Sequence, residues 1–456
     1  MKLSLSKIVL LFLISLRTEA QPCFTTMSYF PTGDTPRAIT TGDYNGDGNN
    51  DIATANDYGK SISVLFGDGL GNFAAPVNYT FTNNTNAIAS GDFNNDGKPD
   101  LVASQTNNSL KILTNDGTGN FTSVLTATMS GSAYSLLATD IDSDNDIDII
   151  TANDTWNNIC VLKNNGSGSF PVAVSYLSGT NPKGLISGDF NNDGFKDLAV
   201  ASSGSNYVHI FKGVSTGTFA AMTSFTTGVN PNCITAADFN NDGIIDLATA
   251  SGTANKVSIL KGSGTATFAV IGSYAVTQAP VTITTGDFNG DGIADLATSN
   301  SNYNSGIDNA SFLIGTGVGT FTYTGILLGQ QTDDALSITN ADFNNDGHTD
   351  IATANNTSSN CTIILLCGGV TTGAIEKYSD HHINVYPNPG KGVFIIESTT
   401  LINNIKIYDQ LGTEVYNKYF DNKTAINLDT EELPQGLYFI KINGNESDYK
   451  KLVITY

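Results

Sequence analysis

Short runs of alternating apolar and polar residues recur along most of this chain, and turn-forming residues separate them. The first set of runs covers residues 38–42, 51–55, 61–66 and 73–79, with Gly, Asn and Asp concentrated between them. Alternation with a period of two, bounded by such turns, is typical of half-buried β-strands. Apolar residues at helical spacing are absent from this part of the sequence. The pattern therefore predicts an all-β protein.

The set of four runs repeats at a nearly constant period. A nine-residue motif, Asp-x-Asn-x-Asp-Gly-x-x-Asp, lies between the first and second runs and occurs seven times, at intervals of 49, 48, 49, 49, 49 and 55 residues. The motifs begin at Asp43, Asp92, Asp140, Asp189, Asp238, Asp287 and Asp342. Four antiparallel strands repeated every 40–50 residues or so (about the length of one blade) are the signature of a β-propeller. We therefore expect a seven-bladed β-propeller.

The two ends of the repeat region complement each other. The last set has three runs, ending at residues 362–367, and no fourth run follows before the composition changes. Residues 23–30 align with the fourth run of the first set, at residues 73–80. We therefore expect the N-terminal strand to complete the last blade, with Cys23 near Cys367 or Cys361 as a candidate covalent link. Cys160 and Cys233 are expected to be buried small residues.

The repeat region is strongly acidic, and most of its charge lies in the motifs. The chain has a net charge of −22, and residues 21–375 contain 31 Asp, no Glu and 10 Lys plus Arg. A surface this acidic repels nucleic acids and anionic membranes. Of the 31 Asp, 22 belong to the motifs, so bound divalent cations would neutralise much of the charge. We interpret the acidity as the charge of cation sites.

Each motif supplies oxygen ligands at alternate positions. In the first motif, Asp43, Asn45, Asp47 and Asp51 occupy positions 1, 3, 5 and 9, a backbone carbonyl is available at position 7, and Gly48 permits a sharp turn. Calcium takes about six to eight such ligands in a flexible cage, whereas magnesium demands rigid octahedral geometry. We therefore expect Ca²⁺ at up to seven sites. An EF-hand is excluded, because the region has no Glu for position 12 and no flanking helices.

The other motifs place ligands at the same positions. These sets are Asp92, Asn94, Asp96 and Asp100; Asp140, Asp142, Asp144 and Asp148; Asp189, Asn191, Asp193 and Asp197; Asp238, Asn240, Asp242 and Asp246; Asp287, Asn289, Asp291 and Asp295; and Asp342, Asn344, Asp346 and Asp350. The third motif departs from the pattern, with Asp142 at position 3 and Asn145 in place of Gly. Asn tolerates positive φ, so the turn can form. One copy would fit an ordinary turn equally well, but seven copies in register favour cation sites.

These repeats resemble the FG-GAP (VCBS-type) repeats of integrin α-subunit propellers and of many secreted bacterial proteins. The acidic motif is the specific part of the resemblance, and the segments FGDG at residues 66–69 and FAAP at residues 73–76 are a loose copy of the motif that names the family. The match covers residues 23 to about 368. It implies a seven-bladed propeller with calcium between the first two strands of each blade. In that family the ions are chiefly structural, and ligands bind on another surface.

A different region follows the repeats. We expect a propeller over residues 21–369, a linker over residues 370–383, and a small Ig-like β-sandwich over residues 384–456. Five motifs stand in order at residues 385–389, 405–409, 411–415, 433–438 and 450–454. They closely resemble the C-terminal sorting domain (type A) of the type IX secretion system of Bacteroidetes. The resemblance implies passage across the outer membrane by that machinery, followed by release or attachment at the cell surface.

The first 20 residues fit a secretory signal peptide. Lys2 and Lys7 form its basic start, residues 8–16 its apolar stretch, and residues 18–20 a plausible cleavage site. The apolar run is about half the ~20 residues that a transmembrane helix needs, and no later segment is longer. We expect an exported monomer with no transmembrane segment.

Loop insertions indicate which face of the propeller binds a ligand. The 55-residue interval arises from extra residues in loops on the face opposite the acidic motifs, and variable loops on one face of a repeat array are often its binding face. The candidate ligand-binding residues on that face are Trp156, Tyr303, Asn304, Asp308, Gln331, Asp333 and Asp334. Ordinary solvated loops are the alternative interpretation of these residues.

Two functions fit the sequence. The first is a secreted or cell-surface, non-catalytic module that binds or adheres to a glycan or a protein. The second is a polysaccharide-degrading enzyme (a lyase or a glycosidase) or its accessory subunit. We identify no catalytic residue, because the propeller region has no Glu and nearly all its Asp pairs lie in the motifs, Asp333 and Asp334 being the one free adjacent pair. The sequence therefore favours the binding module.

Overall fold

The computed structural model describes residues 23–277, 279–301, 309–327, 334–367, 383–386, 393–408, 414–430, 433–443 and 447–454. Its contacts divide the chain into two compact units, Met1–Thr371 and Thr372–Tyr456. The predicted signal peptide at residues 1–20 and the predicted linker at residues 370–383 lie outside the described residues, apart from the final linker position.

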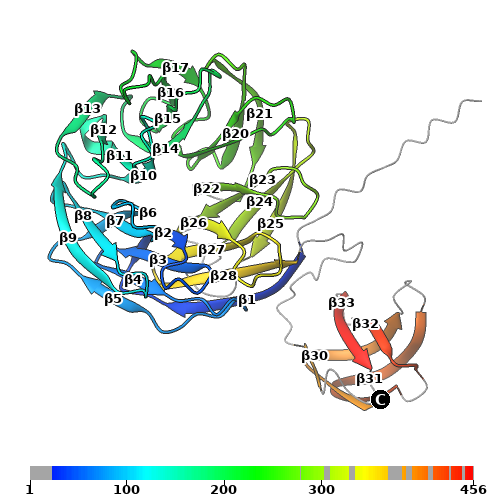
Figure 1. The fold of residues 1–456 in the computed structure, drawn as a ribbon. Helices are drawn as coiled ribbons and strands as arrows, with labels where there is room; N and C mark the ends of the chain where they lie inside the picture. Colours follow the sequence, from blue (N-terminus) through cyan, green and yellow to red (C-terminus); the bar gives the residue numbers. More distant parts are fainter. Residues whose placement is uncertain are drawn as a thin grey trace, which may run out of the picture. The chain divides into compact units, whose positions relative to one another are not determined.

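The described strands of the first unit form seven four-stranded sheets, which stand around a ring (Figure 1). The first strand of each sheet is innermost, and the first strands of consecutive sheets contact one another all the way round. They are β2 (Pro36–Gly42), β6 (Thr85–Gly91), β10 (Ser135–Thr139), β14 (Pro182–Gly188), β18 (Pro231–Ala237), β22 (Pro280–Gly286) and β26 (Ala335–Ala341). This arrangement is a β-propeller, as the repeats predict.

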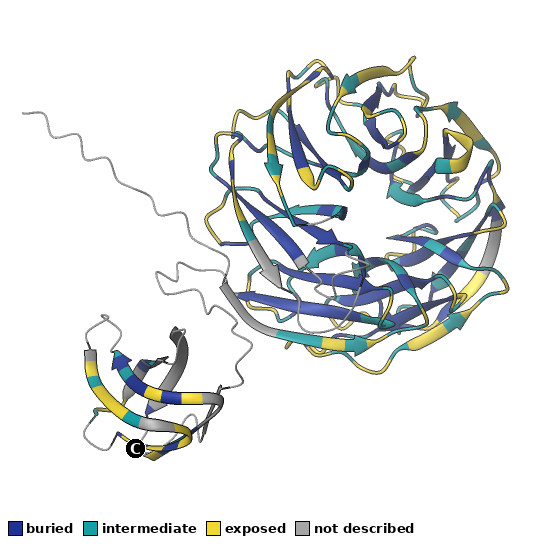
Figure 2. Ribbon diagram, turned by 180° about the vertical axis from the view of Figure 1, so that it is seen from behind, coloured by how far each residue is buried: buried dark blue, intermediate teal, exposed yellow. Residues whose placement is uncertain are grey.

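The second and third strands of each sheet are the most buried, as Figure 2 shows. The second strands are β3 (Asp51–Asn56), β7 (Asp100–Gln105), β11 (Asp148–Asn153), β15 (Asp197–Ser202), β19 (Asp246–Ser251), β23 (Asp295–Asn300) and β27 (Asp350–Asn355). The third strands are β4 (Ser61–Leu65), β8 (Ser109–Asn115), β12 (Asn158–Leu162), β16 (Tyr207–Phe211), β20 (Lys256–Gly262), β24 (Asn309–Gly315) and β28 (Asn360–Cys367). Apolar residues on these strands form the core.

The fourth strands form the outer rim. They are β5 (Val77–Thr80), β9 (Phe121–Thr128), β13 (Ala173–Leu177), β17 (Thr223–Thr226), β21 (Phe268–Ala275), β25 (Phe321–Leu327) and, from the other end of the chain, β1 (Cys23–Pro31). Strand β5 is shorter than the predicted run at residues 73–79, and Phe73 makes only an isolated bridge to Gly67. Pro76, which has no N–H to donate to the ladder, lies in the gap.

The core of the ring lies between neighbouring sheets. One cluster combines Ile62 and Val64 of the first sheet with Leu101 and Leu113 of the second, and equivalent clusters join the other neighbouring pairs. Each sheet therefore buries its apolar side chains against the next one. A sheet of this kind has no core of its own, so the ring is stable only as a whole.

The N-terminal strand closes the ring, as the sequence predicts. Strand β1 pairs antiparallel with β28, so the last sheet contains strands from both ends of the repeat region. The register places Cys23 opposite Cys367 and Phe30 opposite Cys361. Cys361 is a buried free thiol, so the predicted link to this residue is wrong. The side chains of Cys23 and Cys367 lie outside the described residues.

The second unit consists of β29 (Ile383–Tyr386), β30 (Val393–Tyr408), β31 (Glu414–Asp429), β32 (Gly436–Asn443) and β33 (Ser447–Ile454). Strand β30 pairs with β29, β31 and β32, so hydrogen bonding is continuous through it. Its apolar side chains, with those of β31 and β32, form a separate core that includes Phe394, Ile405 and Ile440.

Candidate metal centres

The acidic motif occupies the loop between the first and second strands of each sheet. In the first sheet, β2 ends at Gly42, the motif begins at Asp43, and its ninth residue, Asp51, is the first residue of β3. Every second strand begins in the same way with the ninth-position Asp. All seven described loops therefore lie on one face of the ring.

The first Asp of the motif organises the backbone of its own loop. Both oxygens of Asp43 accept backbone N–H bonds: Oδ1 from Gly46 (2.8 Å) and Asp47 (3.1 Å), and Oδ2 from Gly48 (2.9 Å). The bonds from positions 5 and 6 recur in the loops that begin at Asp92, Asp140, Asp189, Asp238, Asp287 and Asp342. The loop is therefore already wrapped around a carboxylate at its centre.

The sixth position turns the chain and requires a positive φ. The glycine there has φ of +86° at Gly48 and +81° at Gly97, and Asn145 of the third loop has φ of 71°. Nothing lies within 4 Å of a Cβ built at Gly48 or Gly97. The preference for glycine is therefore a matter of backbone conformation, and Asn145 satisfies it as predicted.

The ninth Asp is completely buried in every loop. Outside the fifth loop, its two oxygens accept backbone N–H bonds from different parts of the sheet; for Asp51 these come from Tyr44 in the loop (2.8 Å) and Gly67 after the third strand (2.8 Å). A buried carboxylate without a counter-charge resists ionisation.

The pKa of every ninth-position carboxyl is accordingly raised, with burial as the largest cause and the other motif carboxylates as a further one. The pKa is raised to about 6 at Asp51, Asp100, Asp148 and Asp350 and to about 7 at Asp295. The pKa values of Asp197 and Asp246 are raised as well. A cation at this position would supply the missing counter-charge.

The third and fifth positions face each other. The Asn45 amide donates to Asp47 Oδ2 (2.9 Å), and the equivalent pair recurs in the second, fourth, sixth and seventh loops. In the fifth loop the Asn240 amide reaches the ninth-position Asp246 instead (2.7 Å). In each of these loops the amide hydrogen occupies a side of the carboxylate oxygen that a cation could otherwise bind.

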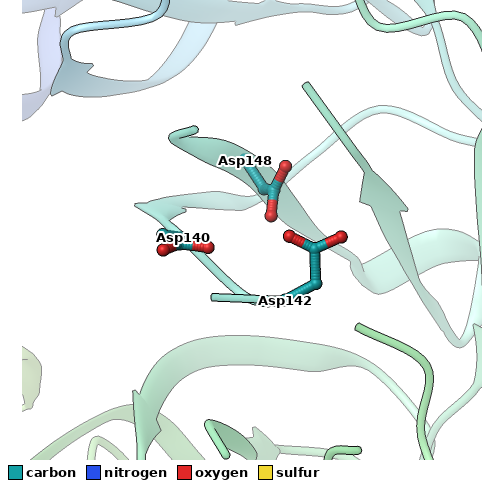
Figure 3. Close-up of side chains that lie close together, drawn as sticks. All are labelled: Asp140, Asp142 and Asp148. Atoms are coloured by element: carbon teal, nitrogen blue, oxygen red, sulfur yellow. The ribbon is translucent and has the colours of Figure 1, made fainter. Parts of the chain in front are cut away.

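The third loop gathers the most carboxylate oxygen. Asp140, Asp142 and Asp148 each place an oxygen within 4.8 Å of the others, and they point toward a common space (Figure 3). Burial and the neighbouring Asp142 and Asp146 raise the pKa of Asp144. Three hard oxygen donors converging in this way match the ligand chemistry of calcium.

Lysine ammonium groups lie against several of these carboxylates. Lys261 Nζ is 2.9 Å from Asp242 Oδ2, Lys163 Nζ is 3.1 Å from Asp142 Oδ2, and Lys98 Nζ is 3.7 Å from Asp96 Oδ2. The hydrogen bond from Lys261 lowers the pKa of Asp242. A positive charge is therefore accommodated beside the fifth or third position of three different loops.

Contacts that sequence reasoning missed tie each loop to the next sheet. The buried Asn115 donates to the carbonyls of Tyr44 (2.8 Å) and Pro99 (3.0 Å), and Asn164 bonds Phe93 and Ile147 in the same way. The second motif position, aromatic in six of the seven loops, is also buried. Tyr44 packs edge-on against Phe121 of the next sheet, 5.7 Å between ring centroids. The recurrence of this aromatic was the signal available in the sequence.

The proposed ligand face is described only in part. Trp156 is 59% exposed in a short 3₁₀ turn, η1 (Asp154–Trp156). Asp334 is only 6% exposed, and it accepts a hydrogen bond from Ser301 (3.1 Å), so it offers little surface to a ligand. Its position immediately before β26, an innermost strand, explains the burial. Tyr303, Asn304, Asp308, Gln331 and Asp333 lie outside the described residues.

Two family profiles match the chain. The FG-GAP-like repeat matches residues 43–103, 92–151, 140–200, 189–249 and 238–298, and the secretion system C-terminal sorting domain matches residues 384–455. Among curated proteins, no sequence matches the chain. Within the described residues, no helix has the length and apolarity needed to cross a membrane.

Several solved structures are similar in fold. A chain in the crystal structure of BBS1N in complex with ARL6DN, soaked with mercury, is 11% identical, with 78% of this chain and 99% of that chain covered and a TM-score of 0.55. A chain of the lead-soaked form is 11% identical, with 79% of this chain and 100% of that chain covered and a TM-score of 0.55. A third similar structure is a chain of a humanized mutant of the Chaetomium thermophilum Polycomb Repressive Complex 2 bound to the inhibitor GSK126. It is 9% identical, with 78% of this chain and 99% of that chain covered and a TM-score of 0.53. At these identities the likeness concerns the fold alone.

Proposed function

We propose that this chain, which belongs to the FG-GAP-like repeat family and carries a type IX secretion sorting domain, is a calcium-binding surface propeller that binds a glycan or a protein without catalysis. The sorting domain makes it a secreted protein, located outside the cell or on its outer surface. We further propose that the propeller is a monomer and that the sorting domain is its contact with the secretion machinery.

One observation carries the calcium assignment: the ninth-position carboxylate is fully buried in all seven described loops, and no described Lys or Arg forms an ion pair with it. The side chains at positions 1, 3, 5 and 9 and the carbonyl at position 7 would hold the ion. Bound calcium supplies positive charge to a loop that otherwise concentrates carboxylates. Because each loop also contacts the next sheet, an ion held there supports the ring as well as its own loop.

The buried His209 of the propeller is poorly placed for catalysis. His209 is buried, with its Nδ1 2.8 Å from Ser224 Oγ and its Nε2 3.3 Å from Ser205 Oγ, and burial lowers the pKa of its imidazole. His348 follows the sixth position of the seventh acidic loop. A general acid or base must reach a substrate proton, and a side chain buried within a sheet is poorly placed for that. The degradative enzyme remains the alternative.

Calcium removal tests the cation assignment. Purified full-length protein should contain calcium by elemental analysis, and EDTA should lower its melting temperature by several degrees, because each emptied loop then holds unneutralised carboxylates. Calcium should restore the original melting temperature, and magnesium at equal concentration should restore it less. A protein without bound metal, whose melting curve is the same in EDTA and calcium, would contradict the assignment.

A glycan array and a panel of surface proteins, probed with and without chelator, test the binding role. Product analysis on any bound glycan separates the two functions. Intact glycans after prolonged incubation support a binding module, whereas shortened or unsaturated sugars would establish the enzyme.

A further inference from the structure

Two cations converge on one tyrosine at the face opposite the acidic loops. Arg37 Cζ lies 5.4 Å and Lys183 Nζ lies 5.0 Å from the centroid of the Tyr134 ring. Arg37 and Lys183 are the second residues of β2 and β14, and Tyr134 immediately precedes β10. The first, third and fourth sheets therefore contribute side chains to one cluster, where their innermost strands begin.

A carboxylate is already paired with Arg37, and a second one acts on Lys183 from nearby. Asp57 Oδ2 lies 3.5 Å from Arg37 Nη1, and the Asn84 amide fixes Asp57 through its Oδ1 (2.8 Å). Burial lowers the pKa of Lys183, while the nearby Asp154 favours its charged form. Because the two cations and these two carboxylates balance, the cluster does not depend on a ligand anion.

The donors of the cluster are held in place. Lys183 Nζ donates to Asn232 Oδ1 (3.1 Å), and the Lys183 backbone carbonyl accepts a hydrogen bond from the Ser135 hydroxyl. Both cationic side chains are half-buried. Little side-chain entropy remains to be lost when such groups bind a ligand.

An exposed aromatic surface lies beside this cluster. Trp156 ends the turn that Asp154 begins, and its indole covers Gly131, where an added Cβ would lie 2.6 Å from Cδ1. Gly131 is three residues before Tyr134 in the same loop. The Trp156 ring is therefore fixed against the loop that carries Tyr134, although 59% of the residue is exposed. Asp154 supplies a hydrogen-bond acceptor in the same turn.

We propose that Trp156, Asp154 and the Arg37–Tyr134–Lys183 cluster form a binding site for a neutral saccharide. The apolar face of a sugar ring stacks on the indole, and its hydroxyls bond the fixed donors and the carboxylate. An acidic saccharide is disfavoured, because the protein carries a net charge of −22 and Arg37 is already paired with Asp57. This inference rests on the proposed glycan-binding function and specifies its site and ligand class.

The single tryptophan of the chain makes the site directly observable. Full-length protein in calcium is titrated with neutral hexasaccharides of glucose, mannose, xylose or N-acetylglucosamine, and with acidic hexasaccharides of galacturonate or glucuronate. We expect a saturable change in Trp156 fluorescence with at least one neutral sugar and weaker or no change with the acidic ones.

Variants locate the binding by calorimetry. Trp156→Ala and Lys183→Met should each weaken binding of the neutral sugar about tenfold or more. Leu70→Ala is the matched control, since Leu70 is 71% exposed on a turn at the face of the acidic loops. An unchanged melting temperature in calcium shows that each variant is folded, and Lys183→Arg, which keeps the charge, should bind more tightly than Lys183→Met.

The outcomes separate this inference from the function on which it rests. A glycan that binds the protein equally well after Trp156→Ala would overturn the site and leave the binding function intact. Tighter binding of an acidic hexasaccharide, or no response to any neutral one, would overturn the ligand class. If neither the glycan array nor the protein panel shows binding, the proposed binding function is contradicted as well.

Discussion

At the scale of single residues, the sixth motif position shows how one backbone angle selects an amino acid. Gly97 has φ of +81° with open space around its missing side chain, and Asn145 adopts φ of 71° at the equivalent place. The left-handed region disfavours most side chains but is accessible to Asn, whose short polar side chain bonds locally. The exception in the third motif therefore follows the same rule as the glycines.

Substitutions at Gly97 test this explanation. Gly97→Ala should lower the free energy of unfolding by about 1–2 kcal/mol, because alanine is strained in the left-handed region. Gly97→Asn should cost less, since asparagine occupies the same position in the third loop. Chemical denaturation in EDTA measures both without a contribution from bound metal. Equal losses for the two variants would show that the cost has another source.

His209 gives the stability a pH dependence. Burial lowers the pKa of its imidazole below the ordinary 6.5, so the unfolded chain takes up a proton first as the pH falls. Its contribution to stability is complete above pH 6.5 and is lost as the pH falls from there toward the pKa of the folded state. When the pH is lowered from about 7.5 to about 5.5, the melting temperature of the His209→Asn variant should therefore fall less than that of the natural protein. An identical loss in both proteins would contradict this role of His209.

At the scale of elements, the acidic loop is a connection between sheets as well as a candidate metal site. Asn115, at the end of β8, bonds the carbonyls of Tyr44 in the first loop and Pro99 in the second. Tyr44 also packs against Phe121 of β9. A change in one loop therefore reaches the neighbouring sheet through hydrogen bonds and an aromatic contact.

Removing this connection should affect a loop that does not contain the changed residue. Asn115→Ala leaves two carbonyls without their donor and should lower the free energy of unfolding by about 1–3 kcal/mol. It should also weaken calcium binding, measured by calorimetry, because the first loop loses a support. Asn120→Ala is the control, since Asn120 lies in the next turn but is exposed and bonds only local groups. Similar effects of the two substitutions would argue against coupling between sheets.

At the scale of the whole molecule, closure of the ring depends on strands from both ends of the repeat region. Strand β1 covers β28, which would otherwise present the unpaired edge of the last sheet. Neighbouring sheets share their cores all the way round, so an incomplete sheet weakens the two clusters that it joins. The ring should therefore respond as one unit to loss of this strand.

A chain that begins at Thr32 tests closure. It should melt at a lower temperature than a chain that begins at Cys23, because β28 then loses its backbone partner and becomes an open edge. A synthetic peptide of residues 23–31 should raise the melting temperature again. If the two chains melt alike, β1 contributes nothing to the ring.

The repeated pattern allowed much of the fold to be predicted from the sequence. The strand periodicity, the seven acidic motifs and the complementary ends indicated the propeller, its closure by the N-terminal strand and the positions of the loops. Local chemistry also predicted that Asn145 can adopt the positive φ of the glycines whose position it takes. These features depend on neighbouring residues or on a fixed period, which a sequence displays directly.

Features that depend on distant residues could not be predicted in this way. Asp334 follows Asp333 in a polar run and was a candidate ligand contact, yet the ring buries it immediately before β26. The cluster of Arg37, Tyr134 and Lys183 joins three sheets, and no spacing along the chain indicates it. Such contacts arise only when the innermost strands meet around one axis.

The sequence by itself determined the repeating unit, the position of its acidic loops and the export of the protein, because each is encoded in local pattern or motif. The tertiary structure alone decided which carboxylates are buried, which asparagines bridge neighbouring sheets and which cations meet across the ring. Burial and long-range electrostatics depend on what the fold brings together, so residues of the same type in similar local sequences take different roles.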